Sequence, residues 1–170
     1  AYPAQLNDCY AALTWMATHV GELDIDPARI AIYGGSAGGN LAIATTMTAR
    51  DRGGPTIAFL MAPYPMIDDR HATASSLAVT EVGIWDRSGS IEAWQWFLGD
   101  GEADQYAAPA RATDLTGLPP TFMDVGDMDL FRDEDIAFAS RLVQAGIPTE
   151  FHLYPGAYHA SEVFAPAAEL

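Results

Sequence analysis

Lysine is absent from this sequence, and its 8 basic residues are all arginine, against 23 acidic residues and a net charge of −15. A surface this acidic repels phosphate backbones, so we expect no nucleic-acid partner. Long hydrophobic runs are absent too. The longest uncharged apolar stretch, residues 56–66, contains two prolines and is too short to span a bilayer, so we expect no membrane segment.

The single cysteine, Cys9, excludes an intramolecular disulfide, and its place on the apolar face of a predicted helix indicates a buried thiol. The chain opens on Ala-Tyr-Pro, with neither an initiator methionine nor a signal-like segment, and we expect a cytoplasmic protein. A length of 170 residues with 49% hydrophobic and 18% charged residues is typical of one globular domain, residues 1–170. We expect neither a metal nor a cofactor.

Apolar spacing and turn residues predict alternating helices and strands. The expected helices cover about 6–20, 37–52 and 132–145, and the expected strands cover 29–34, 56–62, 120–125 and 149–154. The strands are continuous apolar runs, which favours an α/β fold with a mainly parallel sheet and helices on both faces. Residues 67–119 break the alternation with three tryptophans and one short helix at about 90–98, and we expect an insert over one end of the sheet.

The pentapeptide Gly34-Gly35-Ser36-Ala37-Gly38 lies where an expected strand ends and an expected helix begins. A G-x-S-x-G at such a junction is typical of a nucleophile elbow, a sharp turn that exposes the serine hydroxyl above the sheet. We expect the turn to be tight enough that only glycine fits on either side of the serine. The alternative is a glycine-rich turn with an incidental serine.

A serine hydroxyl needs a base within hydrogen-bond reach to act as a nucleophile at neutral pH. Among the four histidines, we expect His19 at the surface, His71 in the opening loop of the insert and His152 inside the last strand. His159 follows that strand, at the sheet end where catalytic groups of α/β proteins gather, which is also where Ser36 is expected.

An acid should orient the histidine, and acidic residues cluster after the 120–125 strand. We expect Asp124 to point away from the rim, and the carboxylates of Asp133 and Glu134 to complement a helix dipole. Asp127 and Asp129 remain as candidates. The chain order Ser, Asp, His is that of α/β-hydrolases.

With these motifs, the chain resembles the carboxyl-terminal part of a hormone-sensitive-lipase-like bacterial carboxylesterase, a family with the α/β-hydrolase fold. The matching stretches are 7–13, 26–31, 34–40, 64–70, 118–121, 129–134 and 154–159. The resemblance implies Ser36 as nucleophile, His159 as base and Asp129 as acid, because the family's acid leads a D-P-L-x-D-E-G run. It also implies that the insert forms part of the cap and acyl-pocket wall.

The sequence departs from the family at three places: Gly35 stands where Asp is frequent, Leu130 replaces a proline, and Ala160-Ser161 replaces Gly-Phe after the base. The implied chemistry is hydrolysis of small, short-chain esters through an acyl-enzyme, with the backbone N–H of Ala37 as one oxyanion donor.

The family's H-G-G-G oxyanion stretch is not in this sequence, so we expect a partial esterase sequence. Alone, it should be nearly inactive and should self-associate through an open sheet edge. The alternative function is that of a non-catalytic, ligand-binding protein with this fold. A peptidase or thioesterase would have the same triad, so the triad alone does not exclude either activity.

Overall fold

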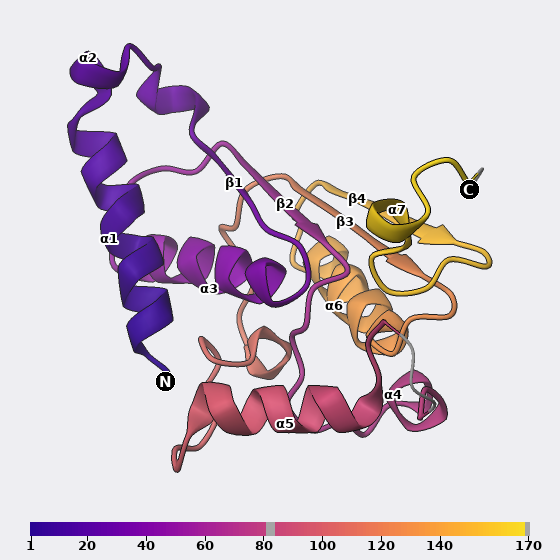
Figure 1. Cartoon of the computed structure of the whole chain (residues 1–170). Coiled ribbons are helices and arrows are strands. Elements are labelled where there is room, and N and C mark those ends of the chain that lie inside the picture. The colour runs from indigo at the N-terminus through magenta and orange to yellow at the C-terminus, as the bar shows by residue number, and fades with distance from the viewer. Residues whose placement is uncertain (81–83, 169–170) are drawn as a thin grey trace.

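The computed structural model describes residues 1–80 and 84–168, which contain a four-stranded parallel sheet in the order β1-β2-β3-β4 (Figure 1). The strands are β1 (Ala31–Tyr33), β2 (Phe59–Pro63), β3 (Thr121–Gly126) and β4 (Thr149–Tyr154). The register pairs Ile32 with Leu60, and Asp124 with His152. All strands therefore end at one side of the sheet, as the apolar runs predicted.

The described residues form the helices α1 (Ala4–Thr18), α2 (Val20–Leu23), α3 (Ala37–Asp51), α4 (Ala74–Ala78), α5 (Arg87–Leu98), α6 (Arg132–Gln144) and α7 (Ser161–Phe164), with 3₁₀ turns at Pro27–Arg29 and Pro109–Arg111. The bounds of the four expected helices agree with those of α1, α3, α5 and α6 to within a few residues. The short helices α2, α4 and α7 were not predicted, because four or five residues are too few for a helical period to show. Within the described residues, no helix is long and apolar enough to cross a membrane.

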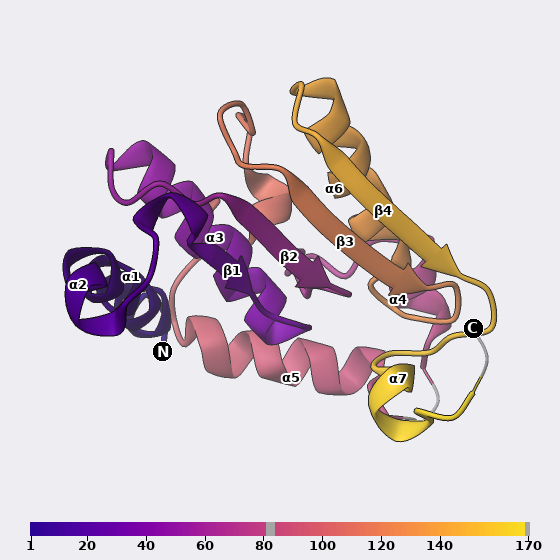
Figure 2. The ribbon, with the colours of Figure 1, turned by 90° about the horizontal axis from the view of Figure 1, so that it is seen from above.

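The core lies between the sheet and the helices α3 and α6, which pack on the same face (Figure 2). Its fully buried side chains include Ile43 and Met47 from α3, Leu60 and Met123 from the sheet, and Phe138 from α6. These side chains alternate along the strands with residues of the other face. Burial of apolar side chains on this scale is the main stabilising contribution to such a domain.

The other face of the sheet carries large side chains that are exposed in the described chain: Tyr33 at 69%, Phe59 at 38% and Met61 at 36%. The predicted parallel sheet flanked by helices is confirmed. In the described residues, however, the long helices α3 and α6 both cover one face, and at the other face the short helix α7 lies beside Tyr33 and Met61 without covering them. β1 lies at one edge of the described sheet, which agrees with the open sheet edge expected from the sequence.

Helix α1 packs beside α3 through Leu13, next to Ile30 and Ala49. Cys9 lies on the flank of this contact and is only half-buried, so the expectation of a buried thiol was wrong. The reason is that Leu6 and Leu13 occupy the buried stripe of α1, and Cys9 falls at its margin.

In the insert, residues 67–119, helix α5 lies at the end of the sheet toward which the strands point, and residues 114–119 run back beside the C-terminal end of α3 (Figure 1). Helix α5 begins at Asp86, whose side chain accepts a hydrogen bond from the backbone N–H of Gly89, and ends at Gly99, whose φ is 61°. Trp94 packs against Met66, Leu130 and Phe131, which lie next to the strand ends. The insert thus contacts the loops that carry the candidate catalytic residues.

Candidate active site

The turn between β1 and α3 has the geometry of a nucleophile elbow. Ser36 adopts φ 56° and ψ −122°, a conformation that is costly for a residue with a Cβ. A side chain at Gly34 would collide with the carbonyl oxygen of Gly38, and one at Gly39 would lie 2.7 Å from the Cβ of Pro65. Gly38 itself has open space around it, so the expectation that glycine is required there was wrong; the tight positions are Gly34 and Gly39.

The backbone of Ser36 is held on both sides by the turn that follows β2. The N–H of Ser36 donates to the carbonyl oxygen of Pro63 at 3.1 Å, and the N–H of Met66 donates to the carbonyl oxygen of Ser36 at 3.1 Å. These two hydrogen bonds fix the strained turn in place. The hydroxyl of Ser36 is then free to point at the loop after β4.

Three predicted residues meet at this point. Oγ of Ser36 lies 2.9 Å from Nε2 of His159, and Nδ1 of the same ring lies 2.7 Å from Oδ2 of Asp129. A carboxylate can only accept, so Nδ1 carries the proton and Nε2 accepts from the serine hydroxyl. The order of atoms is the one that general-base activation of a serine requires.

The ring of His159 is buried and packs against two aromatic side chains. Tyr64 and Phe131 both meet it edge-on, with ring centroids 5.0 Å and 5.1 Å away. The other carboxylate oxygen of Asp129 accepts from the backbone N–H of Phe131 at 3.0 Å. Imidazole and carboxylate are therefore both fixed in orientation by several contacts.

The competing acids have other partners. Asp127 accepts from the backbone N–H of Gly156 at 2.7 Å and makes no hydrogen bond to His159. Asp124 lies on the open face of the sheet, as expected, where burial and the nearby Glu162 raise its pKa to about 6. Between the two candidates that the sequence left open, the structure thus places Asp129 against the histidine.

The remaining histidines lie away from this site. His19 contacts the carbonyl oxygen of Trp15 at the surface, and His152 contacts Glu150 on β4. His71 is buried in the insert with Nε2 at 2.9 Å from Oγ of Ser90. Burial lowers the pKa of His71, so it is a neutral packing residue of the insert.

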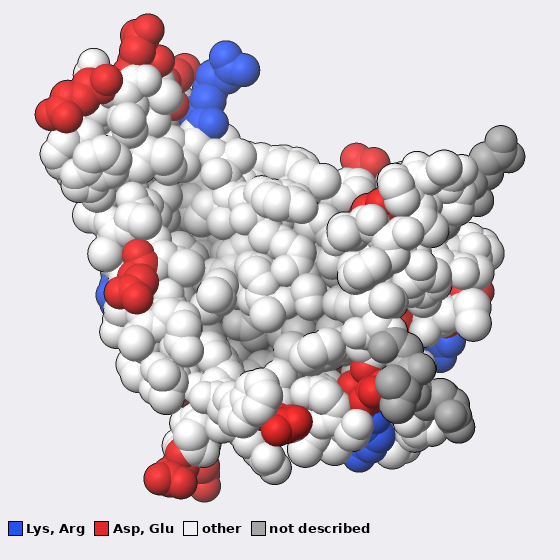
Figure 3. Space-filling model, viewed as in Figure 1, with Lys and Arg blue, Asp and Glu red and all other residues white. Residues whose placement is uncertain are grey.

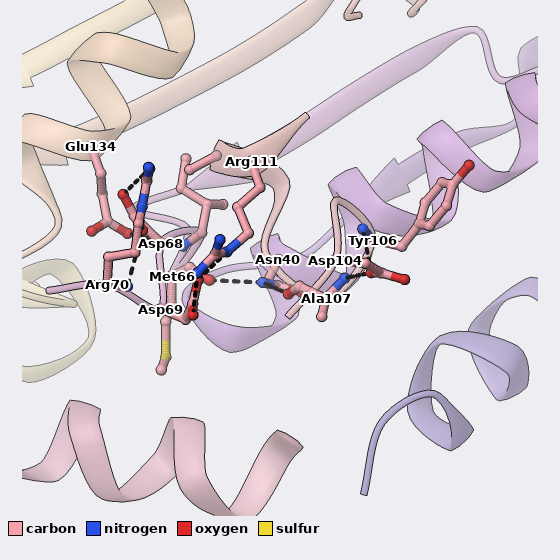
Figure 4. Close-up of polar contacts among 12 residues, drawn as sticks. Asn40, Met66, Asp68, Asp69, Arg70, Asp104, Tyr106, Ala107, Arg111 and Glu134 are labelled. Atoms are coloured by element: carbon pink, nitrogen blue, oxygen red, sulfur yellow. Dashed lines mark hydrogen bonds and ion pairs between the residues drawn. The ribbon is translucent and has the colours of Figure 1, made fainter. Parts of the chain in front are cut away.

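A polar network behind the elbow fixes the turn after β2 (Figure 4). Nδ2 of Asn40 donates to the carbonyl oxygens of Met66 at 2.9 Å and Ala107 at 2.8 Å. Oε1 of Glu134 accepts from the backbone N–H groups of Ile67 at 3.0 Å and Asp68 at 3.1 Å. No sequence signal indicates these roles, although Asn40 and Glu134 lie inside stretches that resemble the family.

Two buried acids lie next to Asp129 on the first turn of α6. Burial raises the pKa of Glu134 and of Asp135 well above the usual range. Both carboxyl oxygens of Asp135 are without a hydrogen-bond partner among the described residues, and its side chain is fully buried. Burial of an unpaired carboxylate is costly, and this favours the protonated form of Asp135. Glu134 therefore does more than complement the helix dipole, the role expected from its position, and no sequence signal points to a role for Asp135.

Two apolar cavities adjoin the serine–histidine pair. One, of about 220 Å³, is lined by residues that include Ala37, Leu41, Trp94 and Phe97. The other, of about 340 Å³, is lined by residues that include Trp85, Leu130 and His159. The aromatic residues Trp94 and Phe97 of the insert are therefore both packing residues and cavity walls.

Charged side chains are sparse in the middle of one face of the molecule. The middle of the face seen in Figure 1, where β1, β2 and α3 lie, is hollowed and almost free of charged side chains, with acidic residues at its rim (Figure 3). Across residues 1–80 and 84–168, His, Cys, Asp and Glu side chains form no cluster of three or more that could hold a metal ion.

Comparison with known proteins gives consistent matches. The profile of the alpha/beta hydrolase fold family matches residues 1–163. Esterase LipI of Mycobacterium tuberculosis is 35% identical over 156 residues, which cover 89% of this chain and 48% of LipI. Carboxylesterase NlhH of the same organism is 34% identical over 176 residues, covering 98% of this chain and 55% of NlhH.

Among solved structures, a bacterial heroin esterase matches with a TM-score of 0.96 and 44% identity, covering 99% of this chain and 55% of that one. The chain thus spans about half the length of the relatives it matches. The fold, the elbow and the matches agree with the resemblance seen in the sequence. The chain belongs to the alpha/beta hydrolase fold family, in its hormone-sensitive-lipase-like branch of bacterial esterases.

Proposed function

We propose that this protein hydrolyses small carboxylic esters with short acyl chains, using Ser36 as nucleophile, His159 as base and Asp129 as orienting acid. The observation that carries the proposal is the pair of contacts at His159, 2.9 Å to Oγ of Ser36 and 2.7 Å to Oδ2 of Asp129. The names of the relatives support ester hydrolysis.

The steps follow from the geometry. Oγ of Ser36 attacks the ester carbonyl carbon while Nε2 of His159 takes the hydroxyl proton. Asp129 stabilises the imidazolium that forms, and the ring then passes the proton to the departing alcohol. Water, deprotonated by the same nitrogen, attacks the acyl-enzyme and releases the carboxylic acid and free Ser36.

The oxyanion of the tetrahedral intermediate needs N–H donors. Ala37 is the first residue of α3, and the first N–H groups of a helix have no partner within the helix. Its N–H follows the nucleophile directly and lies at the positive end of the helix dipole, which favours a negative oxygen there.

The two cavities offer separate places for the acyl chain and the leaving alcohol of an ester. We assign the acyl chain to the 220 Å³ cavity, because it adjoins Ala37, toward which the carbonyl oxygen must point. The leaving alcohol then takes the cavity beside His159, which returns the proton to it. Trp94 and Phe97 of the insert close the acyl cavity, and this supports a role of residues 67–119 as acyl-pocket wall and a preference for short chains.

The apolar surfaces of the chain indicate two kinds of partner, a small-molecule substrate and a second copy of the chain. The substrate is an uncharged small ester, since the cavities are apolar and the hollow face in Figure 3 carries almost no charge. Chains limited to residues 1–170 associate with one another through the exposed edge of β1 and the exposed side chains of Tyr33, Phe59 and Met61.

The test is covalent labelling and turnover in the full-length protein, because the chain spans about half the length of its relatives. A fluorophosphonate probe should label Ser36, and Ser36→Ala should lose both labelling and p-nitrophenyl acetate hydrolysis. Across p-nitrophenyl esters, kcat/KM should be highest for acyl chains of a few carbons and fall for long ones. Turnover by Ser36→Ala at the wild-type rate would refute the assignment.

A further inference from the structure

The loop that carries His159 is anchored very differently on its two sides. Before His159, the backbone N–H of Met128 donates to the carbonyl oxygen of Ala157 at 3.0 Å, and the N–H of Gly156 donates to Asp127 at 2.7 Å. After His159, the hydrogen bonds of residues 160–168 within the described chain are local, with one exception. That exception joins the carboxylate of Glu162 on α7 to the hydroxyl of Tyr64.

Tyr64 is also the aromatic side chain that contacts the base. Its ring meets the ring of His159 at 75° with centroids 5.0 Å apart, and it lies over Gly35, beside the nucleophile. A single side chain thus contacts the histidine with its ring and holds the segment after the histidine with its hydroxyl. Burial and the hydrogen bond to Glu162 raise the pKa of Tyr64, so the phenol stays protonated and donates.

The position of Tyr64 is rigid. Its φ of 35° is unfavourable for a residue with a Cβ, and it persists because the surrounding turn is fixed. The N–H of Tyr64 donates to the carbonyl oxygen of Asp124 at 2.7 Å. Two residues later, Asn40 and Glu134 hold Met66 to Asp68 through the network in Figure 4.

From these contacts we propose that Tyr64 and Glu162 form a clasp that positions His159, so that its Nε2 stays within reach of Ser36. Both are positioning residues, since neither contacts the reacting atoms. The inference rests on the proposed function, because it assumes that His159 is the base. The clasp joins the rigid turn after β2 to the otherwise locally bonded segment after the histidine. Phe131 also contacts the ring of His159 edge-on.

The test uses four single variants of the full-length protein. Tyr64→Phe removes only the hydroxyl and keeps the ring on His159. Glu162→Ala removes the acceptor, and Glu162→Gln keeps an acceptor oxygen. Tyr106→Phe is the matched control, because the hydroxyl of Tyr106 also donates to a carboxylate, Asp51 at 2.9 Å, but far from the site.

We expect Tyr64→Phe and Glu162→Ala each to lower kcat about 10-fold, with KM and the thermal midpoint little changed, because a misplaced base slows the proton transfer and not the binding. Their double variant should lose no more than either single one, since both break the same bond. Glu162→Gln should recover most of kcat, and Tyr106→Phe should match the wild type. The rate of fluorophosphonate labelling should follow kcat.

The clasp is refuted if Tyr64→Phe and Glu162→Ala keep the wild-type kcat, or if their effects on kcat add in the double variant. These outcomes are distinct from a failure of the proposed function, which would appear as turnover by Ser36→Ala. An inactive Ser36→Ala protein together with fully active clasp variants would retain the esterase proposal and remove the clasp alone.

Discussion

Replacing Asp129 by Asn tests the proposed acid most directly, because the side chain keeps its shape and loses its charge. The carboxylate lies 2.7 Å from Nδ1 of His159 and is fully buried. At an effective dielectric constant of about 20, unit charges 2.7 Å apart attract by about 6 kcal/mol. Losing that attraction to the imidazolium in the transition state corresponds to about 10⁴-fold in rate.

The amide also reverses the hydrogen bond. An Asn NH₂ group can donate to Nδ1, and the ring then carries its proton on Nε2, where it cannot accept the proton of Ser36. We therefore expect kcat of Asp129→Asn for a short-chain p-nitrophenyl ester to fall by about 10⁴, with KM little changed.

Asp127→Asn is the matched control on the same loop. Asp127 accepts from the N–H of Gly156, and an amide oxygen can still accept there, so we expect a loss within about 10-fold. A larger loss in Asp127→Asn than in Asp129→Asn would refute the reasoning and move the acid to Asp127. An Asp129→Asn protein that keeps a tenth of its activity would refute the charge argument.

Two further predictions concern stability and association. The pKa of Asp135 is raised by burial and by the acids that face it, Glu134, Asp129 and Asp124, so the folded state binds a proton that the unfolded chain releases above its ordinary pKa. This contribution to stability is complete below that ordinary pKa and is lost as the pH rises toward the folded value, with a slope of up to about 1.4 kcal/mol per pH unit. Asp135→Asn should therefore flatten the decline of the free energy of unfolding as the pH rises above the ordinary carboxyl pKa, measured by urea denaturation. A decline as steep as that of the wild type would contradict the raised pKa of Asp135. For the chain limited to residues 1–170, size-exclusion chromatography should show species larger than a monomer. Its esterase activity should fall about 10²–10³-fold for each missing oxyanion donor. A stable and active monomer would show that the exposed sheet edge and face have no such effect.

The sequence predicted the regular elements because their signals are local. The last strand was placed at its observed bounds, Thr149–Tyr154, since prolines and glycines mark both of its ends. The parallel sheet followed from alternating strands and helices with continuous apolar runs. The same runs did not predict how exposed the second face of the sheet is, because the sequence of an apolar run is the same whether or not a helix covers residues such as Tyr33.

The candidate nucleophile and base could also be named from the sequence. Ser36 lies in a turn motif, and His159 follows a strand, so each is defined by its immediate neighbours. Asp129 needed the resemblance to the family, because position along the chain did not separate it from Asp127. The distance of 2.7 Å to Nδ1 of His159 separates them in space.

Only the tertiary structure determined the contacts between residues that are remote in sequence. Ser36 and His159 are 123 positions apart, Tyr64 and Glu162 are 98 apart, and Glu134 reaches back 67 positions to Ile67. No periodicity or turn signal records such pairs, because they form when parallel strands align and bring their ends to one side of the sheet. Sequence thus determined which residues could react and roughly where the longer helices and the strands lie. The packing of the sheet against α3 and α6 determined which side chains meet.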